Sequence, residues 1–122
     1  MSVPILRQGD VLIASIQVAQ TDAELLAFRD ELSDKVGEVR AKGVIIDVTA
    51  LDVMDSFATR TLRSAAYASR LRGAQTVVVG IQPEVAFAMV QLGLDLGAVS
   101  TALDLDDAIA VLRGQRPTEN GT

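Results

Sequence analysis

The hydrophobic residues of this chain follow two different spacings. Runs rich in β-branched and aliphatic residues, which are typical of buried strands, occur at residues 11–18 (VLIASIQV), 44–48 (VIIDV) and 76–80 (TVVVG). Between these runs, apolar residues recur every three or four positions, which predicts amphipathic helices. In the stretch 21–42 the apolar face is made by Leu25, Phe28, Leu32, Val36 and Val39.

Residues that start and stop helices support the same division. Thr21 is followed three residues later by Glu24, a capping-box pattern that predicts a helix start. Arg40 and Lys42 are expected in the last turn of that helix, and Gly43 is expected to supply its left-handed stop. Further helices are predicted over residues 56–72, 83–93 and 104–113.

The order of these elements predicts the fold class. A short strand before the Gly9-Asp10 turn is expected to pair with the run at 11–18, and a short extended stretch covers 99–102. The resulting order, β-β-α-β-α-β-α-(β)-α, predicts an α/β domain with about four helices, a mostly parallel sheet and an antiparallel N-terminal strand. We expect one domain over residues 1–113 and a flexible polar tail over 114–122.

Composition excludes several classes of function. The chain of 122 residues has no cysteine and no histidine, which removes disulfides, thiol nucleophiles, common zinc sites and the commonest general base. A net charge of -5 and 3% aromatic residues argue against binding of nucleic acid. There is no secretory signal pattern and no apolar run of membrane-spanning length, so a cytoplasmic protein without a cofactor is expected.

Acidic residues after the run at 44–48 allow one catalytic interpretation. The carboxylates of Asp47, Asp52 and Asp55 could hold Mg²⁺ in an aspartyl-phosphate acceptor or hydrolytic domain. Such acceptor domains also need a lysine at the end of a late strand, but the only lysines, Lys35 and Lys42, lie on the first predicted helix. The nucleotide-binding and GxSxG motifs are also missing, so a conventional enzyme is not expected.

Ser56 is the candidate with the most specific setting. It opens the second predicted helix, so Asp55 or Ser56 is expected to cap that helix. The same position suits a phosphoacceptor, because a phosphate at a helix N-terminus is favoured by the backbone N–H groups and the helix dipole. Thr59, one turn further on, is a candidate second acceptor with a structural role as the alternative.

The segment from Gly43 to Leu62, GVIIDVTALDVMDSFATRTL, resembles the signature region of STAS domains, the fold of anti-sigma-factor antagonists. Within that family the chain is similar to the small stressosome antagonists of the RsbS type. The supporting segments cover the chain in order: PIL (4–6), SIQ (15–17), IDVTALDVMDSF (46–57), GIQPEVA (80–86) and TALDLDDAI (101–109).

The resemblance implies a mechanism and a set of partners. In the family, a Ser or Thr that follows an Asp at this helix start is phosphorylated by a GHKL-type kinase, which implies phosphorylation of Ser56. An unphosphorylated antagonist would hold an RsbT-type switch kinase together with RsbR-type co-antagonists. Phosphorylation would release the kinase, and an RsbX-type phosphatase would reset the system. RsbR-type proteins carry an N-terminal sensory domain, so we expect this chain to be the single-domain member. A simple anti-anti-sigma factor that binds an anti-sigma kinase is the alternative.

Two helix surfaces are candidates for partner contacts. At helical spacing from Ser56, a basic stripe is formed by Arg60, Arg63, Tyr67 and Arg70. With Asp52 and Asp55, Arg60 and Arg63 are expected to contact the partner, although a solvated face is the alternative. The third helix is apolar nearly all round, and Leu94 and Leu96 extend its apolar surplus, which favours an assembly surface in a large complex.

Overall fold

The structure is a computed structural model that describes residues 2–97 and 99–114. It contains five strands and four helices in the predicted order. The strands are β1 (Ile5–Gln8), β2 (Val11–Ser15), β3 (Gly43–Asp47), β4 (Gln75–Val79) and β5 (Ser100–Ala102). The helices are α1 (Asp22–Val39), α2 (Ser56–Leu71), α3 (Pro83–Gln91) and α4 (Leu105–Leu112). The predicted α/β fold class is confirmed.

The sheet places its strands in the same order as the chain, β1-β2-β3-β4-β5. The pair β1 and β2 is antiparallel, and the other neighbouring pairs are parallel, as predicted. The central strands are the most buried because helices cover both of their faces: four of the five residues in β3 are buried, and so are four of five in β4.

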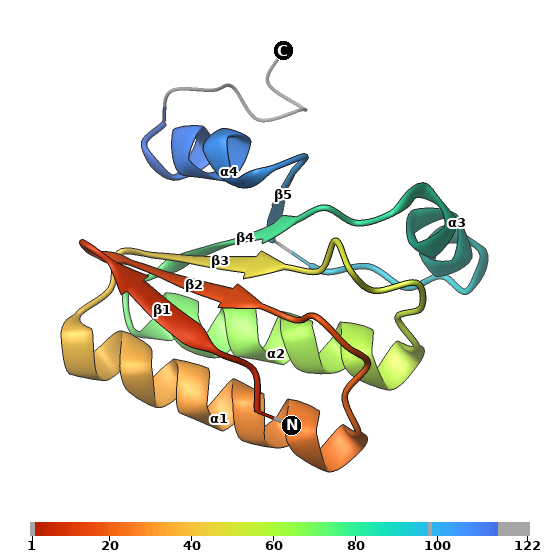
Figure 1. Ribbon diagram of the computed structural model, residues 1–122, viewed down its shortest axis with the longest axis horizontal. Helices are drawn as coiled ribbons and strands as arrows, with labels where there is room; N and C mark the ends of the chain where they lie inside the picture. The colour runs from red at the N-terminus through yellow and green to blue at the C-terminus, as the bar shows by residue number, and fades with distance from the viewer. Residues whose placement is uncertain (1, 98, 115–122) are drawn as a thin grey trace.

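Helices cover the two faces of the sheet unequally (Figure 1). The pair α1 and α2 packs side by side on one face and encloses the larger hydrophobic core with β2, β3 and β4. On the other face α4 packs alone, over a smaller cluster formed by Ile45, Val77, Val79, Ala108 and Val111. The third helix, α3, lies beyond the ends of the strands rather than over either face.

The predicted start of α1 is confirmed, but its predicted end is wrong. The Thr21 hydroxyl accepts from the Glu24 N–H at 3.1 Å, and a Glu24 carboxylate oxygen accepts from the Thr21 N–H at 2.8 Å. The helix stops at Val39, and the left-handed residue is Arg40, at φ 53, instead of Gly43. Gly43 is free to begin β3 because the N–H of Ala41 already bonds the Val36 carbonyl and closes the helix.

The end of β2 also differs from its prediction. Strand β2 ends at Ser15 instead of Val18, because its parallel partner β3 ends at Asp47 and no neighbour continues the ladder. Gly73, just after α2, has a left-handed backbone, at φ 96. The tail predicted over residues 114–122 lies, apart from Gly114, outside the described residues.

The carboxyl ends of the parallel strands and the start of α2 lie at the same end of the domain (Figure 1). Backbone hydrogen bonds continue between the chain segments just past the strands: Val48 donates to the Val79 carbonyl at 3.0 Å, and Gly80 donates to the Ala102 carbonyl at 3.1 Å. The loops at this end are therefore held by the sheet itself. Among the described residues, no helix is long and apolar enough to cross a membrane.

Candidate functional site

The loop between β3 and α2, residues 48–55, carries the predicted site residues at the carboxyl end of the sheet. Leu51 and Met54 are buried and anchor the loop in the main core, while Asp52 and Asp55 are exposed. Side-chain bonds fix its first residues: an Asp47 carboxylate oxygen accepts from the Thr49 N–H at 2.9 Å, and the Gln82 amide donates to the Thr49 carbonyl at 2.6 Å. The loop presents its acidic residues from a defined backbone.

Asp55, rather than Ser56, caps α2. Its carboxylate accepts a hydrogen bond from the Ala58 N–H at 2.8 Å, and its carbonyl accepts from the Thr59 N–H at 3.0 Å. Ser56 occupies the first helical position and is half-buried. No hydrogen bond of its hydroxyl occurs within the described residues, so the side chain is not committed to capping.

Thr59 is in a different environment from Ser56. Its side chain is fully buried at 0% exposure, and its hydroxyl donates to the Asp55 carbonyl at 3.0 Å. That bond fits a structural role for Thr59, which is the alternative to its being a second phosphoacceptor. Phosphorylation of Thr59 stays a prediction, and it would require the first turn of α2 to open.

The carboxylates of Asp47, Asp52 and Asp55 do not form a metal site. Within the described residues, no group of three or more acidic side chains is arranged to hold an ion. Asp47 and Asp55 each use a carboxylate oxygen on a backbone N–H, of Thr49 and Ala58. Asp52 is exposed at the tip of the loop. The structure therefore does not gather the ligands that the Mg²⁺-dependent alternative needs.

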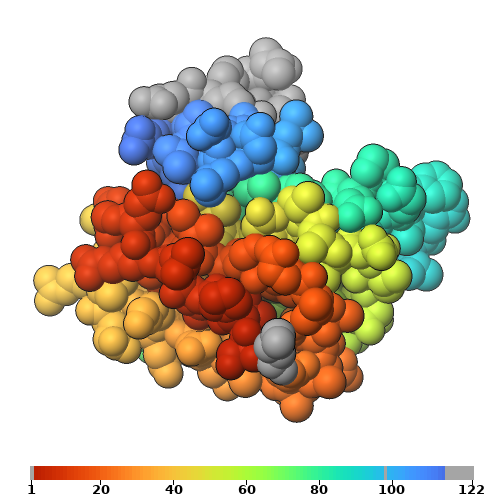
Figure 2. All heavy atoms as spheres, in the orientation of Figure 1, coloured from red at the N-terminus to blue at the C-terminus, as the bar shows by residue number. Residues whose placement is uncertain are grey.

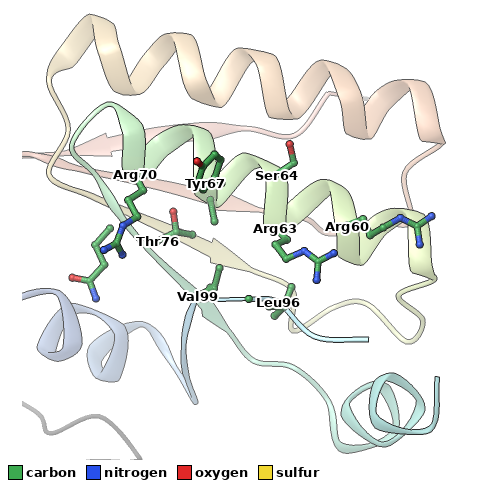
Figure 3. Close-up of a pocket in the computed structure, with 11 residues that line it drawn as sticks. Arg60, Arg63, Ser64, Tyr67, Arg70, Thr76, Leu96 and Val99 are labelled. Atoms are coloured by element: carbon green, nitrogen blue, oxygen red, sulfur yellow. The ribbon is translucent and has the colours of Figure 1, made fainter. Parts of the chain in front are cut away.

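The predicted basic stripe of α2 lines a groove of about 530 Å³. Its lining includes Arg60, Arg63, Tyr67 and Arg70 from α2, with Leu96 and Val99 facing the helix (Figure 3). Arg63 is tied to the facing loop, since its guanidinium donates to the Asp95 carbonyl at 3.0 Å and lies 3.5 Å from the Asp95 carboxylate. Leu62, Ala65 and Ser69 of the same helix, which are buried, do not line this groove.

The third helix has an apolar face that the rest of the domain does not cover. Val85 and Met89 are buried in the main core, whereas Phe87, Val90 and Leu92 are 65%, 77% and 67% exposed. Figure 2 shows this segment projecting from the body of the domain. The predicted extension of the surplus to Leu94 and Leu96 is wrong: Leu96 is buried and Leu94 half-buried, because the chain turns back against the core after Gly93.

One exposed residue beside the candidate serine escaped the sequence reasoning. Val53 lies between Asp52 and Met54 in the loop and is 74% exposed. As an aliphatic residue next to Met54, it carries no clear sequence signal of exposure. Val53 adds an apolar element to the surface around Ser56.

Comparison with known proteins agrees with this geometry. The family model described as "STAS domain" matches residues 3–108. The curated relative "RsbT co-antagonist protein RsbRA" of Bacillus subtilis (strain 168) is 36% identical over 80 residues, which are 66% of this chain and 29% of the relative. The chain thus spans less than a third of the length of the curated relatives it matches.

Solved structures match over more of their length. A serine-to-glutamate variant of Moorella thermoacetica RsbS is 36% identical with a TM-score of 0.79, and the match covers 92% of this chain and 95% of that one. A chain from a structure titled "Molecular architecture of the stressosome, a signal integration and transduction hub" is also 36% identical, with a TM-score of 0.78 and coverage of 91% and 96%.

Proposed function

The chain belongs to the STAS domain family, and we propose that it is a stressosome subunit that sequesters an RsbT-type kinase until Ser56 is phosphorylated. In this function it is a non-enzymatic antagonist of the switch kinase, and the kinase supplies the phosphoryl transfer. The observation that carries the proposal is the position of Ser56, the first residue of α2, with an uncommitted hydroxyl beside a rigid acidic loop.

Local geometry makes this serine a suitable switch. At the helix start, the N–H groups of Ala58 and Thr59 donate to Asp55. Among the described residues, the N–H groups of Ser56 and Phe57 remain as the usual orphan donors of a first turn. These donors favour a phosphate there. Phosphorylation would add about 1.5 to 2 negative charges next to Asp55, which changes the surface strongly without breaking the Asp55 cap.

The surrounding surface offers what a partner needs. Asp52 and Val53 lie exposed in the loop just before the serine, and on the first two turns of α2 the guanidinium groups of Arg60 and Arg63 add positive charge. We propose that this mixed surface contacts the kinase, and that new negative charge weakens the contact through repulsion and desolvation. An RsbX-type phosphatase would restore the binding state.

The exposed apolar face of α3 fits self-association. Three large side chains, Phe87, Val90 and Leu92, are exposed on a segment that projects from the domain. Burying these side chains against other STAS subunits, including RsbR-type co-antagonists, would remove apolar area from water. In this proposal the assembly surface and the switch serine lie at the same end of the sheet but on different helices.

The direct test is incubation with an RsbT-type kinase and ATP, followed by mass spectrometry. We expect one phosphate on Ser56, none in Ser56→Ala and full labelling in Ser64→Ala, which removes an exposed serine two turns along the same helix. Label at another residue, with Ser56 unmodified, would contradict the proposal.

A binding experiment tests the release. Ser56→Glu should weaken kinase binding about tenfold or more, while the charge-matched Ser64→Glu should leave it nearly unchanged. Sizing after addition of an RsbR-type protein separates the two antagonist functions. A large mixed complex supports the stressosome subunit, and a kinase complex that never enlarges indicates the simple antagonist.

A further inference from the structure

The groove beside α2 has the composition of a small-molecule site. Its volume of about 530 Å³ lies in the range of ligand pockets, roughly 300 to 1,000 Å³. Ala66, Leu96 and Val99 supply an apolar floor, and the Tyr67 ring stands at the rim with 64% exposure. A flat apolar body would find contact on both sides of this groove.

One end of the groove carries a positive charge, that of the Arg70 guanidinium. Arg70 has no carboxylate partner among the described residues, in contrast to Arg63, which is engaged by Asp95. Arg60 also lines the groove but stands ten residues before Arg70, about 15 Å away along the helix axis. A single small acid group can therefore bind at the Arg70 end without involving Arg60.

A buried hydroxyl lies at that same end. Thr76 is 5% exposed, and its Oγ1 has no hydrogen-bond partner in the part of the chain that the structure describes. Burying a hydroxyl without a partner costs free energy, so such groups are uncommon in folded proteins. Figure 3 shows Thr76 below Tyr67 and beside Arg70, two exposed side chains that can change rotamer rapidly and open access to it.

From these observations we propose that the groove binds a small amphipathic organic anion. Its acid group, a phosphate, sulfonate or carboxylate, lies between the Arg70 guanidinium and the Thr76 hydroxyl. Its apolar ring or hydrocarbon body lies along Leu96 and Val99 under the Tyr67 ring. The ligand lies at the Arg70 end and does not engage Ser56, so this proposal does not depend on phosphorylation of Ser56.

Two dyes test the proposal on the full chain. We expect saturable 1:1 fluorescence enhancement with 8-anilinonaphthalene-1-sulfonate, and about tenfold weaker binding of N-phenyl-1-naphthylamine, the same body without its sulfonate. Arg70→Gln should lower the affinity for the sulfonate dye about tenfold, to the level of the neutral dye. Arg72→Gln, an equal charge change outside the groove, should not.

Thr76 gives a second, independent readout. Thr76→Val keeps the side-chain shape and removes an unpaired hydroxyl, so it should raise Tm. It should also lower the affinity for the sulfonate dye by about threefold or more. Unchanged dye affinity in this variant would overturn the assignment of the hydroxyl. Phe87→Ser must bind the dye as the wild type does, since loss there would place the dye on α3 and overturn the proposal.

The remaining outcomes are equally decisive. The proposal would be overturned by equal affinity for both dyes, by an equal loss of dye affinity in Arg70→Gln and Arg72→Gln, or by the absence of saturable binding. Displacement of the sulfonate dye by phenyl phosphate but not by equal inorganic phosphate would confirm that the apolar body contributes. Equal displacement by both would reduce the site to one for an adventitious ion only.

Discussion

Replacing Gly80 by alanine should destabilise the domain where β4 ends and supports the loop between β3 and α2. Gly80 follows β4 directly and has a left-handed backbone, with φ 78. A Cβ at this position would overlap the Thr49 hydroxyl oxygen and lie 2.9 Å from Thr49 Cβ and 3.1 Å from its Cα. Because Thr49 is β-branched and its carbonyl is bonded to Gln82, the clash cannot be relieved by a simple rotamer change.

The expected magnitude has two parts. An alanine in the left-handed region costs about 1 kcal/mol, and forcing an extra carbon into a packed site typically costs about 1 to 3 kcal/mol. Together these predict a loss of about 2 to 4 kcal/mol in the free energy of unfolding. For a domain of this size that corresponds to a fall in Tm of roughly 8 to 16 °C.

Gly93 offers a matched control. It has a similar left-handed backbone, with φ 68, but a Cβ there meets nothing within 4 Å. Gly93→Ala should therefore lose only the unfolding free energy that comes from the left-handed backbone, about 1 kcal/mol. Thermal and urea unfolding of both variants measure the difference.

A double variant sharpens the test. Adding Thr49→Ala to Gly80→Ala removes the overlapping hydroxyl and should recover part of the loss, a coupling that two independent sites would not show. If Gly80→Ala and Gly93→Ala lose the same stability, the close approach of Thr49 to Gly80 is not what requires glycine, and the reasoning is refuted.

Three further predictions concern the helix start and the assembly surface. Asp55→Ala should cost about 1 kcal/mol in unfolding free energy and Asp55→Asn markedly less, because asparagine keeps the capping oxygen; equal losses in denaturant titrations would contradict the cap. Thr59→Val should cost about 1 kcal/mol by leaving the Asp55 carbonyl without its side-chain donor, yet mass spectrometry should still find label at Ser56. Val90→Asp should leave Tm within about 2 °C, since Val90 is 77% exposed, but should reduce complex size in light scattering; an unchanged size would exclude this face from assembly.

The strand and helix order was predictable because each element carries its own periodicity. The apolar stripe of α1 became the buried face, with Leu25, Phe28, Leu32 and Val36 all buried. The end of α1 was less predictable, because Gly43 looked like a stop signal and a left-handed arginine is rare. Pairing with β2 and β4 recruited Gly43 into the sheet, and that information lies outside the local sequence.

The candidate site could be proposed from the sequence, but its geometry was less predictable. The helix start and the surrounding motif singled out Ser56 as a candidate, but the sequence left open whether it or Asp55 capped the helix. Only the backbone placement of Asp55 at φ -75 and ψ 178 decided this. The unpaired Thr76 hydroxyl had no sequence signal at all, since a threonine in a buried strand usually finds a partner.

The sequential order of the strands has a consequence for how the domain folds and opens. Every strand pairs with the one that precedes it in the chain, so contacts accumulate in the order of synthesis and the fold needs no late insertion. The last unit, β5 with α4, contributes three strand residues and rests on the smaller cluster. Amide exchange should therefore be fastest in this unit, and it can detach while the core under α1 and α2, which carries Ser56, stays folded.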